Sequence, residues 1–439
     1  MSPPAPAASI RRPSIPRCAR AGNAAWPQPG APKLRGYGLV AALSLAALFG
    51  AGGLLAGGQL RTHAVARAHL RSMEALALAR EALLGYALSY GEHHADKDYG
   101  FLPCPDGGNS GSTPPGACGA RDVGALGRLP WRTLGLPDLR DGWGQCLWYA
   151  VGGSVKNNPK PLTLNWDSPG QLAPHAPDGR ALRAAGPDGL AVAAIFAPGP
   201  VLPGQDRPPG AKSGCGGSDS AEADLAHYLD HGYTARFSAT MPVTQGAPIG
   251  EDAGLTTDLV VWIGIDDIFD ALRRRADHGA HIDALIDTAA DALAARLGEA
   301  DFLAAHTSAT PGVLDIGPLP SAAALGLPAE ERSRLDRWRD QFRFAVCRTG
   351  EPCIALAHDA PPATAGCRGV LLFGGERIRS GSGLQQRDTP ERRADPAQYL
   401  EADNAANFSH GTPSFSGARH FEVDDPLQPA TRDVIRCLP

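Results

Sequence analysis

Few residues of this 439-residue chain have the types and spacing that catalysis needs. The sequence contains no G-x-S-x-G motif, no phosphate-binding glycine loop, no H-E-x-x-H motif and no dinucleotide-binding fingerprint. Gly-Ser-Gly at 381–383 lacks the spacing of a nucleophile elbow, and we interpret it as a loop. The sequence therefore predicts a protein that is not an enzyme and that has no cofactor.

Three groups of residues have the side-chain types of metal ligands. Residues 93–98 include two histidines and two acids, but at the end of a helix such a group is more often a solvated turn. His278 and His281 share one helical face without an acid or cysteine to complete a site, so we expect both to be exposed. Asp106 and Asn109 lie in a Gly-rich segment without the alternating acids of an EF-hand. No metal site is predicted.

The cysteines indicate disulfide chemistry. Eight of the nine follow an uncharged stretch, and an even number fits disulfides in an oxidising compartment, although buried free thiols are the alternative. There is no C-x-x-C pair and no zinc-type spacing. Eight cysteines allow many pairings, but the Gly- and Pro-containing loops between neighbours favour bonds within each half of the chain. The pairs that we expect are Cys104–Cys118, Cys146–Cys215, Cys347–Cys353 and Cys367–Cys437.

The uncharged stretch covers residues 36–60, which is longer than the roughly 20 residues that a membrane-crossing helix needs. Residues 1–35 are Pro-rich and contain basic residues but no acid. The positive-inside rule then places the N-terminus in the cytoplasm. We expect a disordered leader over 1–35, a transmembrane helix over 36–60 and a single-pass inner-membrane protein whose bulk is periplasmic or on an extracellular filament. A cleaved export signal is the alternative.

The helix is expected to continue beyond the uncharged stretch. Residues 61–90 contain no proline and a single glycine, and their apolar residues recur at steps of three, four and seven. One unbroken helix from about Tyr37 to about Tyr90 would be ~80 Å long at the α-helical rise. Its second half must pack its apolar stripe on a folded domain.

A basic leader, then Arg35-Gly36-Tyr37, then one long helix resembles type IV pilins and the pseudopilins of type II secretion. The block at 141–145 is similar to a turn of major pseudopilins, and the resemblance extends over about 36–151. It implies cleavage by prepilin peptidase between Gly36 and Tyr37, and partners that are other pilin-like subunits, packed through the N-terminal helix, and the lipid bilayer. Ala41 stands where prepilins carry a glutamate in assembly.

Residues 127–265 and 317–437 share similar blocks in the same order, which indicates an internal duplication. For example, Trp143 and Val151 are eight apart, as are Trp338 and Val346. The predicted fold class is α+β: a long helix, transmembrane and then amphipathic, on a small antiparallel pilin-like sheet, with a similar module in tandem. We name 61–266 the first module and 267–439 the second module. A helix over 268–297 would be the second module's counterpart of the N-terminal helix.

The function that these features predict is a non-enzymatic pilin-like or pseudopilin-like subunit, as a minor or tip component of a type IV filament or type II secretion assembly. A membrane-anchored periplasmic enzyme or binding protein, with the helix as a tether, is the alternative. The net charge of −5, with acids and bases spread along the chain, gives no basis for a nucleic-acid partner.

Overall fold

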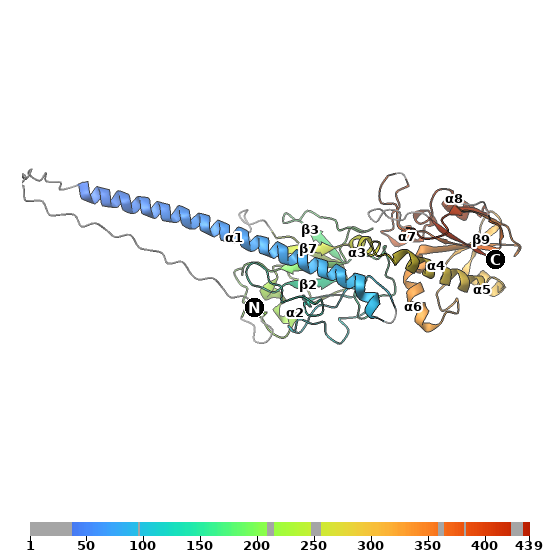
Figure 1. The fold of residues 1–439 in the computed structure, drawn as a ribbon, viewed down its shortest axis with the longest axis horizontal. Helices are drawn as coiled ribbons and strands as arrows, with labels where there is room; N and C mark the ends of the chain where they lie inside the picture. Colours follow the sequence, from blue (N-terminus) through green and yellow to red (C-terminus); the bar gives the residue numbers. More distant parts are fainter. Residues whose placement is uncertain are drawn as a thin grey trace, which may run out of the picture. The chain divides into compact units, whose positions relative to one another are not determined.

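The computed structural model is an α+β protein with several sheets, most of whose strand pairs are antiparallel (Figure 1). The predicted leader over 1–35 and residue Gly36 lie outside the residues that it describes. Those residues are 37–94, 97–208, 215–246, 256–358, 364–381, 383–422 and 433–439.

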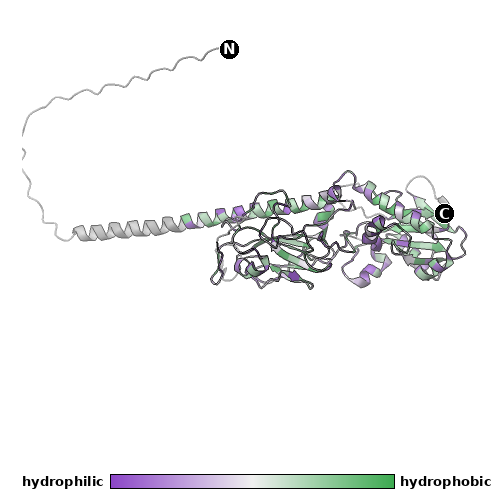
Figure 2. Cartoon of the chain, turned by 90° about the horizontal axis from the view of Figure 1, so that it is seen from below, coloured by the Kyte–Doolittle hydropathy of each residue, from purple (hydrophilic) through white to green (hydrophobic). Residues whose placement is uncertain are grey.

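Helix α1 extends over Tyr37–His93 as one element, as the absence of proline predicts. None of residues 60–71 is buried, and burial begins at Ser72, whose hydroxyl accepts a hydrogen bond from the Gly142 backbone N–H at 2.9 Å. From there on, residues such as Leu76 and Leu83 are fully buried in the main core. Hydrophilic and hydrophobic residues alternate along this part of α1 (Figure 2). The packed face of α1 therefore includes Leu76 and Leu84 of the predicted stripe, whereas Leu70, Met73 and Ala77 of that stripe are exposed.

The membrane assignment needs correction. Among the described residues, no helix is long and apolar enough to cross a membrane. The described side chains of α1 begin near Leu60 and include Arg61, Arg67 and Arg71, and the helix then packs on protein. The fold class with a transmembrane helix over 36–60 and the single-pass inner-membrane location are therefore overturned. The side chains of residues 37–59 lie outside the described part of the chain.

The first sheet lies in the first module and has the strand order β5-β1-β2-β4-β7, with antiparallel neighbours throughout. A separate parallel pair, β3 with β6, lies outside this sheet. The strands are β1 (Gly124–Arg128), β2 (Trp148–Val151), β3 (Leu172–His175), β4 (Ala193–Ala197), β5 (Arg236–Phe237), β6 (Met241–Thr244) and β7 (Leu259–Ile263).

The second sheet lies in the second module and has the order β15-β13-β10-β9-β8, again antiparallel. A three-stranded sheet, β12-β11-β14, contains the parallel pair β11 and β14. The strands are β8 (Ser308–Ala309), β9 (Leu314–Pro318), β10 (Phe342–Cys347), β11 (Ile354–His358), β12 (Thr364–Cys367), β13 (Gly369–Phe373), β14 (Ser414–Gly417) and β15 (Val434–Leu438).

The two modules repeat one topology. The antiparallel series β1-β2-β4-β7 corresponds to β9-β10-β13-β15, and the parallel pair β3–β6 corresponds to β11–β14. A matched contact supports the correspondence: Asp258 accepts the backbone N–H of Asp230, and Asp433 accepts that of Glu401, both at 2.9 Å. The fifth strand of each sheet differs in its place along the chain. In the first module β5 follows helix α2 (Ala221–Tyr228), whereas in the second module β8 precedes β9.

The remaining helices are mostly short. The single helix predicted over 268–297 is two helices, α3 and α4, because the chain turns between them where Arg275 pairs with Glu92 and stacks on Tyr99. The elements are α2 (Ala221–Tyr228), α3 (Ile265–Leu272), α4 (His278–Ala294), α5 (Ala300–His306), α6 (Ala329–Trp338), η1 (Arg339–Gln341), α7 (Pro390–Ala394), η2 (Pro396–Gln398) and α8 (Asp403–His410).

Residues 62–439 form one compact unit, and the predicted boundary at 266/267 falls inside α3. Buried polar contacts join the two modules. Arg387 pairs with Asp167 at 2.9 Å with both side chains fully buried, and the Trp166 indole donates to the Gln341 side chain at 2.9 Å. Since removal of one member of a buried ion pair leaves an uncompensated charge, these contacts make the modules depend on each other.

Candidate functional site

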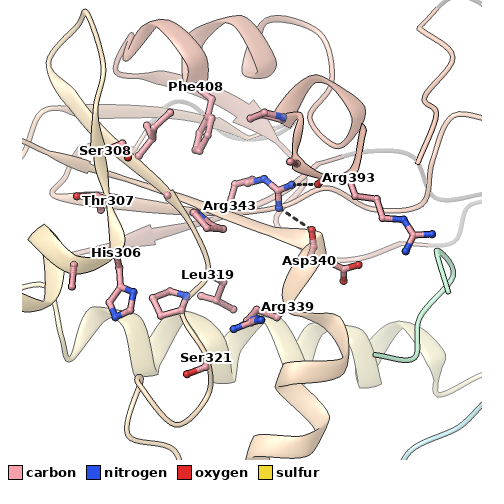
Figure 3. Close-up of a pocket in the computed structure, with 17 residues that line it drawn as sticks. His306, Thr307, Ser308, Leu319, Ser321, Arg339, Asp340, Arg343, Arg393 and Phe408 are labelled. Atoms are coloured by element: carbon pink, nitrogen blue, oxygen red, sulfur yellow. Dashed lines mark hydrogen bonds between the residues drawn. The ribbon is translucent and has the colours of Figure 1, made fainter. Parts of the chain in front are cut away.

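A cavity of about 820 Å³ opens in the second module beside the exposed edge of its sheet. Its walls come from β9 and the segment after it, the end of α5, the start of β10, and α7, η2 and α8 (Figure 3). The apolar part of the lining includes Leu319, Pro396 and Phe408. Hydroxyl groups come from Thr307, Ser308 and Ser321.

The charged lining is mainly basic. Arg339, Arg343 and Arg393 line this space, together with His306, and Asp340 is the one acid among the lining residues (Figure 3). Burial, followed by the nearby Asp167 charge, raises the pKa of Asp340 to about 6. The cavity is therefore cationic at neutral pH and becomes more so in mild acid.

Arg343 is the central cation, and β10 positions it. Its strand pairs with β9 and β13, which directs the side chain to the face covered by η2. The guanidinium donates to the carbonyl oxygens of Phe342 and Asp340 at 2.8 Å and of Arg393 at 3.1 Å, and it lies 4.4 Å from the Tyr399 ring. Burial lowers the pKa of Arg343. Among the residues that the structure describes, this buried guanidinium has carbonyl acceptors but no ion pair with a carboxylate.

The corresponding place in the first module is filled. Trp148 occupies the β2 position that matches Arg343, and its register partner Arg128 on β1 lies 5.0 Å from the indole. Arg128 forms a buried ion pair with Asp224 of α2. Helix α2 also buries Ala221, Leu225 and Tyr228. The first module therefore covers with its own helix the surface that the second module leaves open.

The cover of the second module is shorter. Helix α7 has five residues and none of them is buried, whereas α2 has eight, four of which are buried. The residues of α7 and η2 that line the cavity are Arg393, Ala394 and Pro396, so this cover supplies no acid there. Pro318 stands in register with Arg343, where the first module pairs Arg128 with Trp148. In the first module the arginine of this pair is on β1 and the apolar residue is on β2. In the second module the apolar residue is on β9, which corresponds to β1, and the arginine is on β10, which corresponds to β2.

The eight cysteines form four disulfides, and these are the pairs that the loop argument favours. Each bond stays within one module, with one short and one long loop in each. The disulfides indicate an oxidising compartment. The pairs are Cys104–Cys118, Cys146–Cys215, Cys347–Cys353 and Cys367–Cys437. Of the predicted processing residues, Gly36 lies outside the described residues, and Tyr37 is the first residue of α1.

The metal-type groups have structural contacts instead. His94 stacks on Tyr90 at 3.6 Å between ring centroids, and Asp98 forms a buried ion pair with Arg337. The Asp106 carboxylate accepts backbone N–H groups of the loop that follows it. Among the described residues, no group of three or more metal-ligand side chains is gathered.

The prediction that the two helix histidines are exposed is wrong. His278 is buried and His281 is partly buried, because the turn before α4 folds them against Phe421 and Tyr99 respectively. Burial lowers the pKa of each to about 4, so both are neutral at ordinary pH. Their role in the structure is packing.

The sequence argument missed the cavity. One signal was present: in the aligned windows that begin at Trp143 and Trp338, the position between two apolar matches changes from Trp148 to Arg343. A guanidinium in place of a buried indole requires new polar partners. We compared the chain with protein-family models, curated proteins and solved structures, and none of them matches it.

Proposed function

We propose that the chain is a non-enzymatic structural subunit of an exported assembly of the type IV filament or type II secretion kind, as a minor or tip component. The observation that carries this proposal is α1. It continues as one helix over Tyr37–His93, yet among its described side chains none from Leu60 to Arg71 is buried against the fold. The preceding stretch, 37–60, has no charged residue. A helix with this composition needs other surfaces to cover it.

Exposed apolar residues on the described part of α1 give the same indication. Leu60 and Leu70 are 71% and 62% exposed, and Met73 and Leu78 are also exposed. Several large apolar side chains left in solvent on one helix are typical of a protein contact. The four disulfides suit a subunit that has to remain folded outside the reducing cytoplasm.

Site-specific photocrosslinking in the producing cell tests this proposal. A photoreactive residue at Leu60 or Leu70 is expected to crosslink to proteins that carry a long N-terminal helix, identified by mass spectrometry. The matched control is Leu162, which is 65% exposed but lies in a loop of the first module, and which is expected to give none of these products. Equal products at all three positions, or none at Leu60 and Leu70, would contradict the proposal.

A binding protein is the second candidate function, and the cationic cavity is the observation that favours it. The two candidate functions predict different effects of substitutions in α1. If binding at the cavity were the whole function, replacement of Leu60 and Leu70 by Gln would leave activity in the cell unchanged, whereas an assembly subunit would lose it. The same double variant, checked for folding by circular dichroism, separates the two candidates.

A further inference from the structure

Among the described residues, the buried arginine of the cavity in the second module has no ion pair with a carboxylate, whereas the arginine at the equivalent place in the first module has one. In the first module the arginine of the strand pair, Arg128, is neutralised by Asp224, which α2 supplies. In the second module the arginine has moved to Arg343, and its hydrogen bonds go to backbone carbonyls. Asp340 is nearby, but its side chain accepts from Asn165 at 2.8 Å. A buried guanidinium gains most from a carboxylate in direct contact.

One further arginine is placed to receive an anion, and another lines the cavity. Arg339 is exposed at the rim, and Arg393, partly buried, uses its Nε to bond the Arg387 carbonyl at 2.7 Å. Against these cations there is one lining acid, so the field in the cavity is positive, and a concave wall concentrates it. An anion is therefore favoured over a neutral or basic ligand.

The shape and the remaining lining indicate what carries the anion. The place filled by α2 in the first module takes a peptide segment in which one acid is flanked by small and medium apolar side chains, Ala221 and Leu225. The second module retains apolar walls at Leu319 and Phe408, and the short α7 and η2 lie beside them. A cavity of about 820 Å³ holds several residues of peptide.

We propose that the cavity between β9, β10 and α7 binds an acidic peptide segment of a partner protein, whose carboxylate pairs with Arg343 and Arg339 and whose apolar residues contact Leu319 and Phe408. The segment completes the second module in trans as α2 completes the first module in cis. This inference does not depend on assembly through α1, and either can fail while the other stands.

The test uses the full chain with its disulfides intact and a synthetic probe. The probe is a capped octapeptide with the α2 sequence, AEADLAHY, and the control peptide has Asn in place of its central Asp. Saturation-transfer NMR is expected to show saturable binding of the first, at least tenfold tighter than the control. Binding is expected to weaken as salt is raised, because charges at the open rim are screened.

Variants of exposed residues locate the site without disturbing the core. Arg339→Glu reverses a rim charge, and Ala305→Trp narrows the mouth without changing charge; each is expected to weaken the octapeptide at least tenfold. Arg180→Glu, an exposed arginine of the first module, is the matched control and is expected to have no effect.

Three outcomes of the binding measurements would overturn the assignment, and a competition measurement provides a fourth. They are the absence of saturable binding, equal affinity for the Asn peptide, and binding that survives Arg339→Glu and Ala305→Trp in folded protein. Acetate and phosphate are the competitors that distinguish a peptide site from a general anion site. If either displaces the peptide completely at equal concentration, the cavity binds small anions and the peptide assignment is wrong.

Discussion

The two modules place the same strand pair under different cover. In the first, β1 and β2 lie beneath α2, and the buried Arg128–Asp224 pair closes the contact. In the second, β9 and β10 lie beside the shorter α7, none of whose residues is buried, and a cavity remains. The order of the four central strands and a buried aspartate contact are shared, whereas the cover of this strand pair differs. A repeated fold thus preserves its sheet while one copy exposes a surface that the other uses for its own stability.

The disulfides are expected to produce the largest effect, and an equal one in the two modules. The long loops span 69 residues in the first module and 70 in the second. Loop-closure entropy then predicts a loss of about 4 kcal/mol from the free energy of unfolding for Cys146→Ser with Cys215→Ser, and the same for Cys367→Ser with Cys437→Ser. Urea unfolding without reductant measures both. A twofold difference between the pairs would show that the modules are not equivalent.

Substitutions in the helices α2 and α7 are expected to lower the free energy of unfolding by different amounts, whereas removal of the long disulfides lowers it equally in the two modules. Leu225 of α2 is buried, so Leu225→Ala removes core contacts and should lower the free energy of unfolding by about 2–5 kcal/mol. Arg392 of α7 is exposed, and Arg392→Ala should cost no more than about 0.5 kcal/mol. Similar costs at the two positions, measured by urea unfolding, would mean that α7 covers the second module as α2 covers the first.

A smaller effect, the dependence of stability on pH, is expected from buried acids at equivalent positions of the two modules. Burial raises the pKa of Asp433 to about 7 and that of Glu401 to about 8, and it raises the pKa of Asp258 in the first module. An acid whose folded pKa is raised binds a proton more tightly in the folded state. Stability is then fully present below the unfolded pKa, near 4, and is lost as pH rises towards 8.

The scale of this effect is about 1.4 kcal/mol for each unit of pKa difference. Asp433→Asn keeps an acceptor for the Glu401 backbone N–H but does not titrate, so the fall in stability between about pH 5 and about pH 8 should become shallower. Asp258→Asn should do the same through the first module. Stability that rises over this range, and that neither substitution changes, would contradict the matched role.

The parts of the fold that depend on local pattern could be predicted from sequence. The length of α1 follows from the absence of proline, and the alternating blocks repeat because each module forms the same sheet. The four disulfides follow from loop lengths. The break between α3 and α4 could not be predicted, because it depends on contacts of Arg275 with Glu92 and Tyr99, which are distant in sequence.

The cavity could not be predicted from the sequence, because it results from a shorter cover helix and from the lack of an acid paired with Arg343. The short α7, and an acid that the second module does not place beside Arg343, become visible only when the first module's α2 is seen on the same strand pair. The membrane-spanning assignment failed for a different reason. The absence of charge over 36–60 predicts a span, whereas no described helix reaches the length and apolarity that a span needs.

Arginine modification measures the difference between the two covers most directly. Phenylglyoxal reacts with accessible guanidinium groups, and mass spectrometry of the native chain gives the rate at each arginine. Arg128, buried and paired with Asp224, is expected to react at least tenfold more slowly than Arg339 at the rim of the cavity. Bound octapeptide should protect Arg339 and leave the exposed Arg180 unchanged. Equal rates at Arg128 and Arg339 would contradict the claim that one module is covered and the other open.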